Sequence, residues 1–294
     1  MTEKELDDAA NVYLRLRKKV TETPSNKEKL ERLVLKSDFE RNMKSPLDDL
    51  WNKIKLHPLW AHVKVKLGSA KAEAIAKNTF VSDFEVFRGA IESTGHEWYV
   101  DRARGQNNRP HYTPLGAEAI AFCGRQGHYQ AMPYRTKPEI PYRWARLAML
   151  FCNARKAGDT NTRQFFERLG GDTAGNMRDP TSDGFWRLRD AFRDVGAFGP
   201  VTTLHALMDC GFSVVKPDVW LGRIAHDLGW LIDVDTNAFK AGKRDACTVA
   251  FKRLAAIAER ASVIDGRKHT TRELDAVVSG AGMKGVELTD VAAV

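Results

Sequence analysis

Asp218 lies where a carboxylate can stay charged and still reach a bound molecule. It follows Lys216-Pro217 and precedes a helical pattern whose inward positions are Leu221, Ile224, Ala225 and Leu228. An aspartate at a helix start accepts hydrogen bonds from free backbone N–H groups, and the helix dipole favours its ionised form. An ionised carboxylate can stabilise a nearby cation or activate water. Taken alone, these local features favour a capping role for Asp218, and such a carboxylate would also be available for chemistry.

Two short helices joined by a tight turn are predicted just before Asp218. Their apolar positions are Trp186, Leu188, Phe192 and Val195 in the first helix and Val201, Leu204, Leu207 and Met208 in the second. The turn is formed by residues 196–200, and Gly211 stands where a left-handed residue would end the second helix. Free backbone N–H groups at such a turn can point at a phosphate, so the hairpin is expected to hold a nucleic-acid backbone without reading its sequence.

The order of these parts resembles the helix-hairpin-helix DNA glycosylases, with the match centred on residues 185–230. In that family the hairpin is followed by a glycine- and proline-rich loop and an essential aspartate, which corresponds to Asp218. An arginine follows at the offset of Arg223, and the aspartate helix ends in Leu-Gly, as Leu228-Gly229 does here. Residues 272–278 resemble the helix that completes the fold in several members. The resemblance implies an all-α, glycosylase-like helical fold, with an additional mainly helical N-terminal domain.

The same resemblance implies a DNA N-glycosylase, which flips a damaged or modified base out of the helix and hydrolyses its glycosidic bond. Asp218 would stabilise the sugar cation, activate water, or do both. Members that also cleave the strand carry a lysine at the start of the second hairpin helix, where this chain has Pro200 and Val201. We therefore expect a monofunctional enzyme that leaves an abasic site in base-excision repair.

Base recognition requires a stacking surface and polar groups near the carboxylate. The candidates for the base pocket are Trp220, Trp144, Asn153, Trp186 and His205. The candidates for contact with the DNA backbone are Gly196, Ala197, Phe198, Gly199, Val201, Thr202, Lys216 and Arg223. Core packing would equally explain the aromatic side chains, and a surface contact with phosphate is the expected role of Lys216.

Composition limits the partners and cofactors. The 46 Lys and Arg against 38 Asp and Glu give a formal net charge of +8, which suits a polyanionic partner such as nucleic acid. The resemblance implies DNA as that partner, and we expect it to be double-stranded. The four cysteines are far apart, without the spacing of a zinc or iron–sulfur site, so buried thiols and no metal or cofactor are expected. No apolar run approaches the roughly 20 residues of a membrane span. We expect a monomer in the cytoplasm, associated with the nucleoid.

The sequence divides into three segments with different patterns. Residues 1–45 predict two exposed, charged amphipathic helices, residues 46–140 a helical and then loop-rich basic region, and residues 141–294 the glycosylase-like helical domain. Three alternatives remain open. The large N-terminal part could direct the enzyme to hypermodified bases of invading phage DNA, as an antiviral defence. The hairpin could bind DNA without catalysis, or the basic loop from 102 to 146 could bind RNA.

Overall fold

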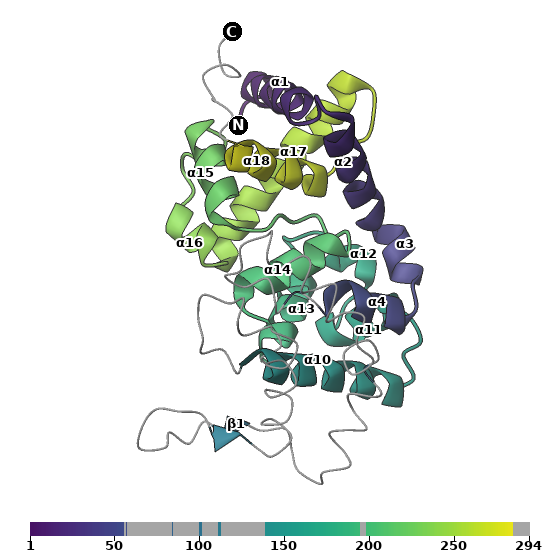
Figure 1. Ribbon diagram of the computed structural model, residues 1–294. Coiled ribbons are helices and arrows are strands. Elements are labelled where there is room, and N and C mark those ends of the chain that lie inside the picture. Colours follow the sequence, from purple (N-terminus) through teal and green to yellow (C-terminus); the bar gives the residue numbers. More distant parts are fainter. Residues whose placement is uncertain are drawn as a thin grey trace. The chain divides into compact units, whose positions relative to one another are not determined.

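The protein is described by a computed structural model that covers residues 1–55, 57, 84, 100–101, 111–112, 139–194 and 198–284 (Figure 1). This part of the chain is mainly helical, as predicted, with one short antiparallel pair of strands. The elements before residue 120 are α1 (Glu3–Val20), α2 (Pro24–Lys36), α3 (Phe39–Lys44), α4 (Leu47–Ile54), β1 (Val100–Asp101) and β2 (His111–Tyr112). The later elements are α10 (Glu139–Lys156), α11 (Thr162–Gly170), α12 (Ala174–Met177), α13 (Asp183–Asp194), α14 (Pro200–Asp209), α15 (Val219–Asp227), α16 (Thr236–Lys240), α17 (Arg244–Asp265) and α18 (Thr271–Lys284).

The chain forms two compact units whose boundaries differ from the three segments expected from the sequence. Unit 1 comprises residues 1–44, 166–190 and 203–294, and unit 2 comprises residues 45–165 and 191–202. The first 44 residues are therefore not a separate domain. They belong to unit 1 because α1 and α2 pack against helices near the other end of the chain.

Helix α1 is a core element of unit 1 and lies against α17 and α18 (Figure 1). Ala9, Ala10, Tyr13, Leu16 and Val20 are buried on it, at a spacing that places them on one face. The expectation of an exposed helix was wrong for α1, because one of its faces is buried against α17 and α18. The predicted break between the first two helices is confirmed, since α1 ends at Val20 and Pro24 begins α2.

A buried cluster of polar side chains ties α1 to α18. The Tyr13 hydroxyl lies 3.1 Å from Nδ1 of His269, and Nε of Arg17 donates to Oε1 of Glu273 at 2.9 Å. Arg267 also donates to Glu273. Burial by itself raises the pKa of Glu273, but the hydrogen bonds from His269, Arg17 and Arg267 outweigh it and lower the pKa to about 2. This buried carboxylate is therefore charged, and its charge is compensated by the hydrogen bonds from its three partners.

Unit 2 is built around aromatic side chains. The rings of Trp51, Phe84, Phe151 and Phe165 form a continuous group, with the Phe151 and Phe165 centroids 4.8 Å apart and the Trp51 and Phe151 centroids 5.5 Å apart. Arg155 on α10 pairs with Asp48 on α4 at 2.9 Å, so an ion pair also joins the two helices that carry Phe151 and Trp51. Strands β1 and β2 pair antiparallel, with Val100 opposite Tyr112. No alternating pattern predicted them, because each has only two residues.

Glu273→Gln tests the buried cluster. Removing one charge from a buried ionic group leaves its partners unmatched, so unfolding at neutral pH should cost about 3 kcal/mol less than in the native protein. The folded-state pKa of Glu273 lies below its ordinary value of 4.5, so its stabilisation is complete above 4.5 and disappears as pH falls towards about 2. Urea unfolding of both proteins across this range should show the two stabilities converging in acid. A constant difference would contradict the assignment.

Candidate functional site

The predicted pair of hairpin helices is confirmed as α13 and α14. Gly196 and Ala197 in the turn lie outside the described residues, as does Val195. Phe198 is buried, and its ring packs on Phe192 with the centroids 5.6 Å apart. Gly199, Val201 and Thr202 are half-buried at the start of α14. The backbone of this turn stays a candidate for phosphate contact, while the Phe198 side chain serves the core of unit 2.

The segment after α14 is anchored by Phe212. Gly211 has a φ of +93°, which confirms the left-handed residue expected there. An added Cβ at this glycine would lie 2.5 Å from the Ser37 carbonyl oxygen, so the close approach also requires glycine. The Phe212 ring packs edge-on against Phe39 and Phe166, at 5.4 and 5.3 Å between centroids. These contacts fix where the chain leaves the hairpin.

A tight turn at Pro217 then presents Asp218. The Asp218 N–H donates to the Lys216 carbonyl at 2.8 Å, a three-residue turn that suits the fixed φ of the central proline. Asp218 is the N-cap of α15, and its Oδ1 accepts from the Leu221 N–H at 2.9 Å. The position at the helix start is therefore confirmed.

Asp218 remains partly accessible beside a cation and an aromatic ring. Its side chain is 22% exposed, and its Oδ2 lies 3.6 Å from Nζ of Lys216. Trp220, two residues further on, is 42% exposed, which is unusual for the largest apolar side chain. Arg223 is 68% exposed on the next turn of α15 and pairs with Asp227 at 3.7 Å. These side chains therefore stand at the surface of unit 1.

Behind the segment that carries Asp218 lies a second carboxylate, Asp275, which sequence reasoning missed. Its Oδ1 accepts from the backbone N–H of Lys216 at 3.3 Å, and its Oδ2 accepts from Arg272 at 3.0 Å. The other arm of Arg272 pairs with Asp209 of α14 at 3.0 Å. The spacing Arg272-x-x-Asp275 on a helical pattern was the one available signal, since residues three apart share a face.

Burial controls the protonation of Asp275. The side chain is buried, which raises its pKa; Arg272 opposes the shift, Asp218 adds to it, and the resulting pKa is about 7. Asp275 and Asp218 therefore differ in environment although both contact Lys216. One is a shielded carboxyl group held by an arginine, and the other is a partly exposed helix cap.

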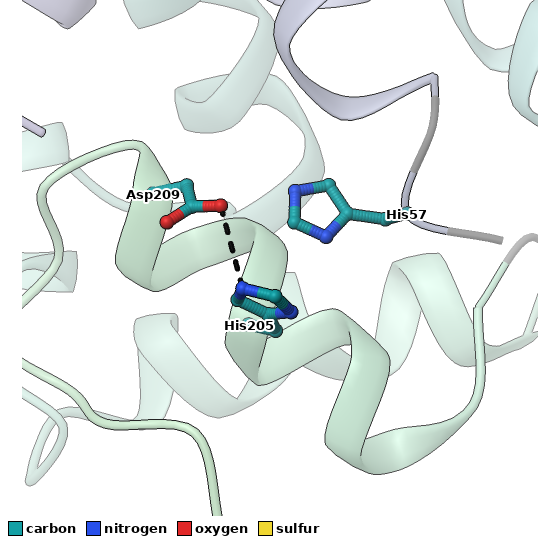
Figure 2. A group of neighbouring side chains, drawn as sticks. All are labelled: His57, His205 and Asp209. Atoms are coloured by element: carbon teal, nitrogen blue, oxygen red, sulfur yellow. Dashed lines mark ion pairs between the residues drawn. The ribbon is translucent and has the colours of Figure 1, made fainter. Parts of the chain in front are cut away.

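His205 belongs to unit 1 and lies one helical turn from Asp209 on α14. Its Nε2 is 3.5 Å from the Asp209 carboxylate, and Figure 2 shows the two side chains with this ion pair drawn. His57, also drawn in Figure 2, belongs to unit 2, where its ring meets Phe198 edge-on at 6.3 Å between centroids. His205 is thus connected through Asp209 and Arg272 to Asp275, and it makes a defined polar contact on its own helix.

Trp186 and Asn153 are the other predicted pocket residues whose side chains the structure describes. Trp186 is 2% exposed, and its indole N–H donates to the Pro180 carbonyl at 2.7 Å. Because its polar group is satisfied inside unit 1, Trp186 is a core residue, and the assignment to a base pocket is not supported. Asn153 is exposed on α10 in unit 2. The side chain of Trp144 lies outside the described residues.

The cysteines offer no metal site among the described residues. Cys152, Cys210 and Cys247 are buried free thiols, as expected, whereas Cys123 lies outside the described part of the chain. Burial raises the pKa of Cys247 to about 12, which keeps it a neutral thiol.

Comparisons of the sequence and structure with protein-family models, curated proteins and solved structures gave no match. Within the described residues, no helix combines the length and apolar character required to cross a membrane. Any function proposed for this site therefore has to be argued from its own residues.

Asp275→Asn tests the shifted protonation. The folded-state pKa of about 7 lies above the ordinary 3.8, so native stability should decrease as pH rises from 3.8 to about 7 and change no further above that. The variant has no such ionisation. Urea unfolding at several pH values should show native stability falling relative to the variant over this interval. A pH-independent difference would show that Asp275 titrates normally.

Proposed function

We propose that the chain is a monofunctional DNA glycosylase, with Asp218 as its catalytic carboxylate. One observation carries the proposal: Asp218 is a partly exposed helix-capping carboxylate that follows the helix pair α13 and α14 and has an exposed tryptophan two residues away. The helical architecture and the sequence resemblance around residues 185–230 support the same reading. The substrate would be double-stranded DNA, and the protein would act as a monomer in the cytoplasm.

The reaction breaks the C1′–N bond of a nucleotide whose base has left the stack. The bonding electrons leave with the base, and positive charge develops at C1′ and the ring oxygen. Asp218 would stabilise that charge and accept a proton from the water whose oxygen bonds to C1′. The departing base gains a proton, so the products are a free base and an abasic site.

Water is the proposed nucleophile because the start of α14 offers no amine. Pro200 and Val201 occupy the place where a lysine would form a covalent adduct. Lys216 is close to Asp218, but its ammonium group is paired with the Oδ2 of that carboxylate at 3.6 Å. Because this carboxylate already engages its ammonium group, Lys216 is not the proposed nucleophile. Lys216 is therefore assigned to the DNA backbone, together with Arg223 and the hairpin.

A non-catalytic DNA-binding module is the second candidate, favoured by the cap itself. The hydrogen bond from the Leu221 N–H to Asp218 gives this side chain a structural role that requires no reaction. Asparagine is as effective at an N-cap as aspartate, so Asp218→Asn removes the charge while keeping the cap. This substitution can therefore separate the two candidates.

Base release should depend on the Asp218 charge. The native protein, incubated with duplexes that carry damaged bases and with hypermodified phage DNAs, should release free base and leave sites that break only in alkali. Asp218→Asn should lose at least a hundredfold in rate while binding the same DNA within twofold, because it loses charge stabilisation of the transition state. Release from phage DNA alone would assign the enzyme to antiviral defence, and release from damaged duplexes alone to repair.

Asp235→Asn is the matched control for this experiment. Asp235 caps α16 in the same unit and accepts from the Asn237 and Ala238 N–H groups. Its substitution should change neither the rate nor the binding. Equal DNA binding without base release by the native protein and both variants would favour the binding-module candidate.

Trp220 should contribute stacking on the base. An aromatic contact with a nucleobase is worth about 1–3 kcal/mol, so Trp220→Ala should weaken binding of the modified duplex about 5- to 150-fold. Because the side chain is exposed, thermal stability should change little. Ile232→Ala, at an exposed apolar position of the same unit, serves as the control in fluorescence-anisotropy titrations. Equal affinities for all three proteins would remove Trp220 from the site.

A further inference from the structure

The backbone just before Asp218 is attached to the C-terminal helix of unit 1 through Asp275. Lys216 donates its backbone N–H to this carboxylate, while its side chain pairs with Asp218. Lys216 is thus held at two points, by a buried acid below it and an accessible acid beside it. Asp218 follows Lys216 by only two residues, and the turn at Pro217 joins them through a backbone hydrogen bond. Fixing Lys216 therefore also restricts the position of Asp218.

We propose that Asp275 is a positioning residue for Asp218, fixing the segment 216–218 on α18 so that the catalytic carboxylate is held in place. The proposal rests on the function proposed above and assigns to Asp275 no contact with DNA. A displacement of about 1 Å at a reacting group can cost roughly a hundredfold in rate, so such an attachment has a kinetic consequence.

Arg272 is what keeps Asp275 in position. Its guanidinium group joins Asp275 on its own helix to Asp209 on α14, and Asp209 in turn pairs with His205. The charged and titratable groups around Asp275 are therefore Arg272 from α18, Lys216 and Asp218 from the linker, and Asp209 and His205 behind the arginine. The set links the end of the hairpin to the start of the Asp218 helix.

Asp275→Ala in the full-length protein tests the proposal with two measurements. The kcat for base release should fall at least tenfold with KM changed by less than threefold, because DNA contacts remain while Asp218 is misplaced. Hydrogen exchange of the Lys216 amide should accelerate at least tenfold, because its acceptor is lost. Asp275→Asn keeps a carbonyl oxygen as acceptor and should restore most of the amide protection.

Glu273→Gln is the control for simple destabilisation. Glu273 is a buried carboxylate of the same helix, but its partners are Arg17, Arg267 and His269. This variant should be less stable, yet should keep the native kcat and the native exchange rate at Lys216, with all measurements made where it is fully folded.

Two outcomes would overturn the proposal: an Asp275→Ala protein with native kcat, or one with unchanged exchange at Lys216. A native protein that releases no base from any substrate would refute the proposed function separately. In that case the exchange measurement alone decides whether Asp275 holds the segment, with accelerated exchange supporting it and unchanged exchange rejecting it.

Discussion

The position of the candidate site depends on one guanidinium group that serves two carboxylates. Arg272 lies 3.0 Å from Asp209 and 3.0 Å from Asp275, so its single positive charge is shared between acids of α14 and α18. A buried carboxylate is costly unless it is paired or protonated. With Arg272 in place, Asp275 can stay inside unit 1 and accept the backbone N–H of Lys216. The linker that carries Asp218 is thereby attached to the core at a polar point as well as at Phe212.

This arrangement gives two neighbouring carboxylates different properties. Asp275 is buried, and its pKa is raised to about 7, whereas Asp218 is partly exposed and accepts a helix N–H. Acids in contrasting environments can take different roles in one site. For this chain the contrast supports the division proposed above, with Asp218 facing the ligand and Asp275 fixing the backbone. A stable scaffold for the pair requires α18, which packs against both α15 and α1.

Local rules were enough to predict the parts around Asp218 but not their tertiary partners. The two hairpin helices, the left-handed Gly211 and the capping position of Asp218 each follow from apolar spacing, glycine or cap chemistry within a few residues. The bond from Lys216 to Asp275 spans 59 positions, and that from Arg17 to Glu273 spans 256. No periodicity within one helix contains such contacts. The sequence indicates Trp186 both as an inward position of its helix and as a pocket candidate, and its indole bond to the Pro180 carbonyl favours the first of these roles.

Capping and catalysis are compatible roles for Asp218. An ionised carboxylate has about four acceptor positions, and the Leu221 N–H uses one of them, on Oδ1. Its Oδ2 faces Lys216, whose side chain is 36% exposed, so the ion pair lies near solvent, where such pairs contribute only about 0–1 kcal/mol. A DNA phosphate could therefore draw Lys216 away at little cost and leave Oδ2 available. The cap bond would meanwhile keep the carboxylate aligned with the helix start, so the structural role would serve the proposed chemistry.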